Sequence, residues 1–248
     1  MKLIKISKLK KLFQVFLFSI LFSCAKGSFT SDLASTSPFN KPNDSGNNNP
    51  GNNDPLELYT PLTWEKTMRE RAAWSAMVYQ IIQTQEPGLL NQQVNDMATF
   101  CPRYDELSKM KKLNFWGQLI SSMAKFESGW KPTDRYVETT MGTDPVTGQK
   151  VVSEGLLQLS YQDVKNHPGL CLFDWSKDKL LSANDPRKTI FDPFKNLQCG
   201  VRILARQIRN KHAIAVDQGA YWSVIKLGSS HQHIQEISRM IRDLDFCD

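Results

Sequence analysis

Residues 115–130 read FWGQLISSMAKFESGW, and this stretch decides the fold class. Its apolar side chains recur every three or four residues, which is the period of a helix that buries one face: Phe115, Leu119, Met123 and Phe126. Asn114 is a favourable N-cap for that helix, and Gly129 is a favourable residue to end it. Glu127 is therefore expected in the last turn of an apolar helix.

That position favours a carboxyl group that keeps its proton. The negative end of the helix dipole disfavours ionisation, and the neighbouring Phe126 and Trp130 would add desolvation. Both effects raise the pKa of Glu127 toward neutral pH, as a general acid requires. Taken alone, the same residue also fits an exposed glutamate at a fraying helix end.

The helical period continues on both sides of this stretch. Apolar stripes of helical spacing fall within residues 74–82, 197–208 and 234–244, and Asp192-Pro193 is a typical N-cap followed by proline at the first helical position. Residues 135–153 differ, because they are rich in Val, Thr, Tyr and Gly around the turn sequence Asp144-Pro-Val-Thr-Gly148. The predicted fold class is mainly α (α+β), with one small β-hairpin.

The first 58 residues are typical of an export signal followed by a disordered tether. Residues 1–23 carry five lysines, no acidic residue and an apolar run of about 11 residues, too short to span a bilayer but typical of a signal peptide. Leu21-Phe22-Ser23-Cys24 resembles a bacterial lipobox, in which Cys24 would be lipidated. Residues 24–58 are rich in Asn, Ser and Pro and predict a disordered tether. Residues 59–248 are left as the folded domain.

These features predict an exported protein that is anchored through Cys24 to the outer membrane and faces the periplasm, with ordinary secretion as the alternative. Without residues 1–23 the chain has 26 basic and 25 acidic residues, so its net charge falls from +6 to +1. Such a balance gives no reason to expect nucleic acid as a partner, or any membrane contact beyond the lipid. A monomer is expected.

Four further cysteines, Cys101, Cys171, Cys199 and Cys247, are an even number in an oxidising compartment and predict two disulfides. Three connectivities are possible, and we favour Cys171–Cys199 with Cys101–Cys247. No Cys-x-x-Cys spacing is present, and the pair His231-Gln-His233 lacks a third ligand. We therefore expect neither a metal nor a cofactor.

Beside Glu127, three further segments of the sequence carry information about function. They are Ser153-Glu-Gly-Leu-Leu-Gln-Leu-Ser160, Asp192-Pro-Phe-Lys-Asn-Leu-Gln-Cys-Gly-Val-Arg-Ile-Leu204 and Ala220-Tyr-Trp-Ser223. Together, and in this order, they resemble the goose-type lysozyme and soluble lytic transglycosylase superfamily, whose pattern is Glu-Ser at a helix end, Gly-Leu-x-Gln, Asn-x-x-x-Gly and Ala-Tyr. The resemblance covers roughly residues 115–223 and implies a lysozyme-like helical domain with its hairpin beside an active-site cleft.

Residue by residue, the resemblance implies that Glu127 is the general acid. Ser128 matches a neighbour that helps hold the acid or the sugar, Gln158 matches a glutamine that contacts the substrate, and Tyr221 matches a tyrosine near the acid. Asn196 and Gly200 match positions that mainly pack a helix. Trp222 departs from the pattern, which has asparagine there, and the hairpin lengthens the span after Glu127. Trp130 and Trp222 adjoin the matched motifs, so they are the tryptophans expected in the cleft.

The resemblance implies cleavage of peptidoglycan glycan strands, at the β-1,4 bond between N-acetylmuramic acid and N-acetylglucosamine or a de-N-acetylated variant. Glu138, on the first arm of the hairpin, is the best second carboxylate for holding water, which favours a hydrolase. An exposed strand glutamate is the other interpretation of Glu138. Two functions stay open beside hydrolysis: a lytic transglycosylase that forms anhydro-muropeptides, and a lipoprotein that binds peptidoglycan without cleaving it.

Overall fold

The computed structural model describes residues 60–248. The predicted signal peptide, Cys24 and the predicted tether lie outside these residues. The described part is mainly helical, with one two-stranded sheet, and follows the order α1 Thr63–Thr67, α2 Ala72–Gln85, α3 Met97–Phe100, α4 Lys109–Ser128, β1 Arg135–Val137, β2 Val152–Glu154, α5 Asp163–Asn166, α6 Trp175–Asp178, α7 Pro193–Lys211 and α8 Ile234–Arg242. Short 3₁₀ turns lie at Arg69–Arg71, Pro87–Asn91, Tyr104–Glu106, Thr189–Phe191 and Ser223–Ile225. The coarse prediction of helices with a small hairpin is confirmed.

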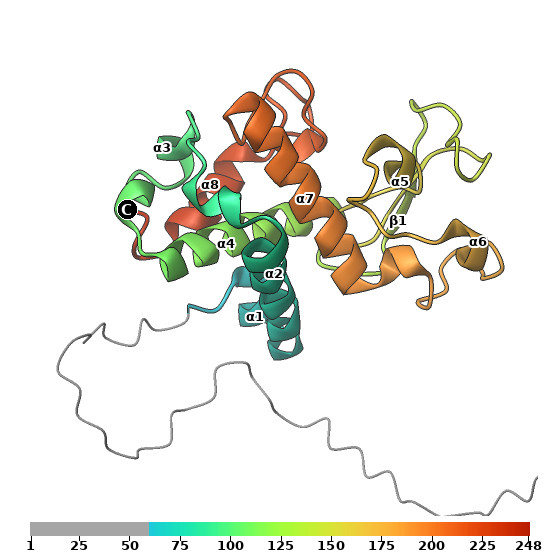
Figure 1. The fold of residues 1–248 in the computed structure, drawn as a ribbon, viewed down its shortest axis with the longest axis horizontal. Coiled ribbons are helices and arrows are strands. Elements are labelled where there is room, and N and C mark those ends of the chain that lie inside the picture. Colours follow the sequence, from blue (N-terminus) through green and yellow to red (C-terminus); the bar gives the residue numbers. More distant parts are fainter. Residues whose placement is uncertain (1–59) are drawn as a thin grey trace, which may run out of the picture. The chain divides into compact units, whose positions relative to one another are not determined.

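Helix α4 runs through the middle of the domain (Figure 1). It begins earlier than predicted, because Ser108 is its N-cap and accepts a hydrogen bond from the Lys111 amide. The prediction of Asn114 as the cap is wrong: Asn114 is buried within the helix and donates to the Thr60 carbonyl and the Tyr79 hydroxyl, at 2.7 and 2.9 Å. Gly129, in the left-handed conformation at φ 59°, ends the helix directly after Glu127 and Ser128.

The core forms where the other helices pack on α4. Helices α1, α2 and α8 contact α4, and α2 also packs against α7. Gly117 of α4 allows a close approach, since a Cβ atom there would lie 2.7 Å from the Tyr79 ring and 2.9 Å from Leu62. Helix α4 therefore carries its last turn, with Glu127, on a rigid and fully packed support.

Helix α7 fixes the loop that follows the hairpin. Asp192 caps it by accepting from the Lys195 amide, as the sequence predicts. The buried Asn196 side chain bridges to the Glu154 carbonyl and the Leu157 amide, at 3.1 and 2.9 Å. A Cβ atom at Gly200 would lie 2.3 Å from Leu157 Cδ1. Both residues thus pack α7 against residues 154–157, the role that the sequence resemblance implied for them.

The hairpin is antiparallel, with Arg135 opposite Glu154, Tyr136 opposite Ser153 and Val137 opposite Val152. Its turn lies at Asp144–Gly148, as predicted, and the Asp144 carboxylate accepts from the amides of Val146 and Thr147. The same carboxylate accepts from the Gln162 amide at 2.9 Å. Asp144 therefore forms the turn and also joins the hairpin to the segment before α5.

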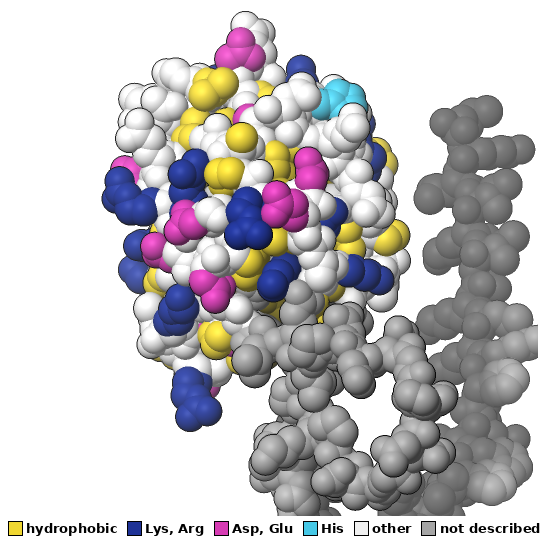
Figure 2. Space-filling model, turned by 90° about the vertical axis from the view of Figure 1, so that its left-hand side faces the viewer, with side chains coloured by type: hydrophobic (Ala, Val, Ile, Leu, Met, Phe, Trp, Pro, Cys, Tyr) yellow, Lys and Arg dark blue, Asp and Glu magenta, His cyan; other side chains and the backbone are white. Residues whose placement is uncertain are grey.

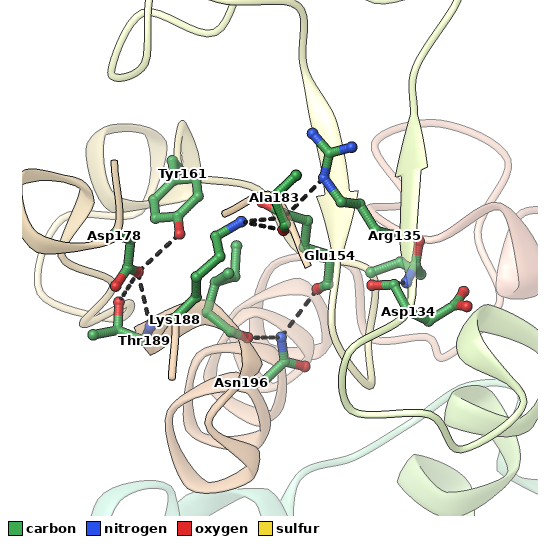
Figure 3. A network of polar contacts seen from close by, with 11 residues as sticks. Asp134, Arg135, Glu154, Tyr161, Asp178, Ala183, Lys188, Thr189 and Asn196 are labelled. Atoms are coloured by element: carbon green, nitrogen blue, oxygen red, sulfur yellow. Dashed lines mark hydrogen bonds and ion pairs between the residues drawn. The ribbon is translucent and has the colours of Figure 1, made fainter. Parts of the chain in front are cut away.

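A buried ion pair supports the outer side of the hairpin (Figure 3). Glu154 accepts from the Lys188 ammonium at 2.5 Å and from the Arg135 guanidinium at 3.2 Å. Both Glu154 and Lys188 are almost fully buried. A carboxylate held in this way serves the fold.

Two disulfides close the chain on itself. Cys101 is bonded to Cys247, and Cys171 is bonded to Cys199, which is the connectivity favoured from the sequence. The first bridge joins the end of α3 to the segment after α8, and the second joins the segment before α6 to α7. Only the second bridge is attached to a long helix, because Cys199 lies on α7.

The surface of the domain carries charges of both signs. Figure 2 shows one face on which basic and acidic side chains are interspersed, without a large field of one sign. Within residues 60–248, no helix is both long and apolar enough to cross a membrane.

Candidate active site

A cleft of about 960 Å³ lies in front of the last turn of α4. One wall is the hairpin with the residues that follow β1, and the other is formed by α5 and by the segments before α8. The polar and aromatic side chains that line it are Phe126, Glu127, Asp134, Tyr136, Glu138, Thr139, Thr140, Ser153, Gln158, Ser160, Gln162, Asp163, Asn166, His167, Tyr221, Trp222, Ser223, His231 and His233. Glu127, Glu138, Gln158, Tyr221 and Trp222, all predicted site residues, come together here.

Glu127 is half-buried in this cleft at the end of α4. Its Oε1 atom is buried and has no hydrogen-bond partner among the described residues. Burial raises the pKa of the Glu127 carboxyl to about 8, and the nearby Glu138 carboxylate adds to the increase. Such a carboxyl holds its proton at neutral pH and faces a space that a ligand can enter, which is what a general acid needs.

Glu138 follows β1 on the opposite wall of the cleft. Its carboxylate accepts from the Ser153 hydroxyl at 2.5 Å, and its amide donates to the Val151 carbonyl at 3.0 Å. Tyr136 lies two residues earlier, on the same face of the strand, and is 56% exposed while lining the cleft. The hairpin thus presents a carboxylate and an open aromatic ring to the same space.

Tyr221 and Asp163 form a polar pair beside Glu127. The Tyr221 hydroxyl donates to the Asp163 carboxylate at 2.5 Å, and that carboxylate also accepts from the Ser160 amide at 2.8 Å. Burial raises the pKa of Asp163, and the hydrogen bonds from Tyr221 and Ser160 oppose the increase. Burial also raises the pKa of Tyr221, with Asp163 and Glu127 contributing. Since the phenol O–H donates its hydrogen bond to Asp163, the phenol oxygen can accept a hydrogen bond from a protonated Glu127.

Gln158 lines the cleft in an uncommon backbone conformation, at φ 47°. Its amide nitrogen donates to the Gly155 and Asp134 carbonyls, at 3.0 and 3.4 Å. The side-chain oxygen is therefore the polar atom that Gln158 can offer to a ligand. A non-glycine residue held at positive φ costs of order 1 kcal/mol or more and often marks a functional site.

Ser128 does not line the cleft. It is buried, and its hydroxyl donates to the Leu156 and Ala124 carbonyls, at 2.9 and 3.1 Å. The prediction that Ser128 contacts substrate is replaced by a positioning role, because these bonds tie the end of α4 to the loop after the hairpin.

Of the two tryptophans expected in the cleft, Trp222 lines it and Trp130 does not. Trp222 is 2% exposed and donates from its ring nitrogen to the Leu157 carbonyl at 2.8 Å, so it contributes only an edge to the cleft. Trp130 lies outside the cleft, in a separate hollow, and its ring nitrogen donates to the Ser121 carbonyl at 2.8 Å. Neither ring lies open in the cleft for a sugar to stack on.

Several cleft residues were missed from the sequence: Tyr136, Asp163, His167, His231 and His233. Tyr136 could have been found, because it lies two positions from Glu138 on a predicted strand. Asp163 could not have been found, since nothing in the sequence pairs it with Tyr221. His233 stacks on Phe126 with the ring centroids 4.2 Å apart. Among the described residues, no three His, Cys, Asp or Glu side chains are grouped to hold a metal ion.

The fold and the cleft define a small helical protein with two facing glutamates, and comparison with solved structures places it in a family. The chain is similar to Bd0314 DslA, a Bdellovibrio protein, in its wild-type form, with 31% identity and a TM-score of 0.62. The match covers 76% of this chain and 98% of DslA, so the chain belongs to the same family as DslA. No protein-family model matches the chain, and no curated protein matches it significantly.

Two further structures of DslA match almost equally well, with TM-scores of 0.62 and 0.61 at 31% identity. Each carries one glutamate-to-glutamine substitution, and the two substituted glutamates lie eleven positions apart in that chain. Glu127 and Glu138 are also eleven positions apart here. These substitutions indicate that the family is enzymatic and uses glutamate.

Proposed function

We propose that this protein is a glycosidase that cleaves the glycan strands of peptidoglycan, at the β-1,4 bond between N-acetylmuramic acid and N-acetylglucosamine or a de-N-acetylated variant. The observation that carries the proposal is Glu127: a carboxyl with a pKa near 8 and an unpartnered buried oxygen, at the end of a rigid helix and inside a cleft. The motif order that resembles the goose-type lysozyme and lytic transglycosylase superfamily supplies the substrate class.

Glu127 would protonate the glycosidic oxygen as the bond to the sugar breaks. Tyr221 supports this step, because its hydroxyl already donates to Asp163 and can only accept from the Glu127 carboxyl. A hydrogen bond in that direction, formed when substrate is bound, would favour the protonated form of Glu127 and orient it. After transfer, the Glu127 carboxylate is left to stabilise positive charge on the ring.

Glu138 supports hydrolysis over transglycosylation. It lies across the cleft, near enough to raise the pKa of Glu127, and Ser153 holds its carboxylate in place. A carboxylate in that position can take a proton from an incoming water. The equal eleven-residue spacing in DslA, where both glutamates were replaced, supports a role for the pair. A transglycosylase would instead use the substrate's own hydroxyl and need only Glu127.

The central test is Glu127→Gln, assayed on purified sacculi with mass spectrometry of the released fragments. We expect the variant to fold and to lose nearly all turnover, a fall of about 10²–10⁴-fold for a lost general acid. Glu106→Gln, at an exposed glutamate away from the cleft, is the matched control and should keep full activity.

The products then separate the chemistries. Reducing-end muropeptides support hydrolysis and a role for Glu138, whereas anhydro-muropeptides alone would remove Glu138 from the reaction. Digesting native and de-N-acetylated sacculi side by side gives the preferred form of the sugar. Binding to sacculi without release of fragments, in the wild-type chain, would favour a peptidoglycan-binding protein over an enzyme.

We also propose export and lipid attachment at Cys24, on the lipobox-like Leu21-Phe22-Ser23-Cys24 and the signal-like residues before it. A tethered enzyme of this kind would act on the wall from the outer membrane. Metabolic labelling with palmitate should mark the wild-type chain and fail to mark Cys24→Ser. Equal labelling of both chains would contradict the anchor.

A further inference from the structure

A second hollow of about 410 Å³ lies beside the active-site cleft. We name it the tryptophan hollow, and its lining is Met68, Arg71, Trp74, Trp130 and the segment 131–134. Of these residues, only Asp134 also lines the cleft. The hollow is therefore a distinct surface that meets the cleft at one shared residue.

Lys125 gives a second link between the two surfaces. Its ammonium lies 5.6 Å from the centre of the Phe126 ring, which lines the cleft, and 5.8 Å from the Trp130 ring, which lines the hollow. Asp134 is visible in Figure 3, with its carboxylate pointing away from the Glu154–Lys188 ion pair. A polymer lying in the cleft could thus place a branch in the hollow without crossing a gap.

Arg71 is held in a fixed position within the hollow. Its guanidinium carbon lies 5.3 Å from the Trp74 ring and 5.3 Å from the Trp130 ring, at distances typical of cation–π contacts. It also donates to the Thr67 hydroxyl at 2.8 Å and to the Trp130 carbonyl at 3.4 Å. The two indoles thus hold a cation between them, which makes them poor platforms for stacking a sugar ring.

The charges around the hollow favour an anionic ligand. Arg71, Lys125 and Lys131 provide three cations, and none of them forms an ion pair with a carboxylate among residues 60–248. Asp134 is the acid in the lining. The walls are otherwise apolar, through Met68, Pro132 and the two indoles. Carboxylates on a chain with small apolar groups match this combination.

We propose that the tryptophan hollow binds the peptide stem of peptidoglycan, the carboxylate-bearing peptide attached to the muramic acid residues, next to the bond that is cut. This inference rests on the proposed function and adds the part of the polymer that the domain recognises. On a strand without peptides the only carboxylate is the lactyl group next to each muramic acid ring, whereas a stem peptide carries its carboxylates and small apolar groups farther from the sugar. The hollow therefore favours strands that still carry their peptides.

The test compares glycan strands that carry stem peptides with the same strands after an amidase has removed the peptides. Equilibrium binding is measured on a Glu127→Gln background, so that no turnover is needed. Arg71→Gln and Lys131→Gln should each weaken binding of the peptide-bearing strands about tenfold or more, the scale of a lost charge-assisted hydrogen bond. Binding of the stripped strands should be unchanged.

Lys226→Gln is the matched control, because Lys226 is an exposed cation outside both the cleft and the hollow. Circular dichroism checks that every variant is folded. Equal weakening for both kinds of strand, or no weakening for either, overturns the proposal. This outcome is independent of catalysis, because an inactive wild-type chain would remove the proposed glycosidase while the binding comparison still decides the role of the hollow.

Discussion

Glu127 keeps its proton for two physical reasons that act at a single residue. Burial at the end of α4 removes water from the carboxyl, and the Glu138 carboxylate across the cleft repels a second negative charge. The sequence predicted the direction of this pKa shift from the helix end and the flanking aromatics. It named desolvation correctly, but Trp130, one of the two expected sources, faces the other hollow.

The pH dependence of the reaction follows from that pKa. In the proposed function the protonated form of Glu127 is the acid, and the protonated fraction falls as the pH rises through about 8. We expect kcat/KM on soluble glycan strands to hold near neutral pH and to fall about tenfold per pH unit well above 8. The measurement is a pH–rate profile of the wild-type domain. A decline already complete by pH 6 would contradict the assignment of Glu127 as the acid.

Tyr221 and Asp163 should affect the rate without contributing a proton of their own. Tyr221→Phe removes the hydroxyl that the Glu127 carboxyl can bond to, and Asp163→Asn weakens the group that orients that hydroxyl. We expect each variant to lower kcat by about 10²-fold at most, with a smaller change in KM, as for a misplaced catalytic group.

Because the two act as a unit, the double variant should be little worse than either single one. If the rate of Tyr221→Phe falls off at a lower alkaline pH than that of the wild type, the phenol supports the protonated form of Glu127. If the losses in kcat of the two single variants add fully in the double variant, Tyr221 and Asp163 act independently.

At the scale of elements, the long helices were predictable wherever the local signal and the packing agree. Helix α7 has its Asp192 cap, its proline and its apolar stripe within one segment, and it forms there. Helix α4 was predicted too short, since Asn114 is a good cap in isolation. The side-chain amide of Asn114 instead donates to the Thr60 carbonyl and the Tyr79 hydroxyl, which are distant in sequence. No local pattern reveals such partners.

The same limit explains the misplaced site residues. Ser128 and Trp222 lie within the matched motifs, yet their polar atoms are used up by the carbonyls of Leu156 and Leu157. A motif gives the position of a residue along the chain, whereas the direction of its side chain depends on which backbone carbonyl lies within reach. The positions of Glu127, Glu138 and Gln158 in the cleft were predictable, because they follow from the helix end, the hairpin and the loop that carry them.

The hairpin depends on Asp144, a buried carboxylate that accepts from the amides of Val146, Thr147 and Gln162. We expect Asp144→Ala to destabilise the domain by about 2–4 kcal/mol, because it leaves buried donors without partners. Urea denaturation followed by fluorescence measures the change. Asp144→Asn keeps one acceptor oxygen and should lose less. Activity should fall as well, since the hairpin carries Glu138.

At the scale of the whole molecule, the two disulfides restrict the unfolded chain to different extents. Cys101–Cys247 spans 146 residues and Cys171–Cys199 spans 28. The loop-entropy relation gives about 5 kcal/mol for the longer loop and about 3.5 kcal/mol for the shorter one. Replacing both cysteines of a bridge by serine should therefore cost more stability for Cys101–Cys247, as measured by denaturation in urea. The opposite order would mean that residual structure or packing, rather than chain entropy, dominates.

The reversal of the chain at Gly129 and Trp130 has a practical consequence. Both residues adopt left-handed backbone conformations, at φ 59° and 61°, so Glu127 faces one surface while Trp130, three residues later, faces another. In the proposed function, bond breaking and recognition of the stem peptide thus depend on separate sets of side chains on one support. A randomised library confined to Met68, Arg71 and Trp74 could then redirect which wall material is engaged, while the cutting chemistry stays as it is.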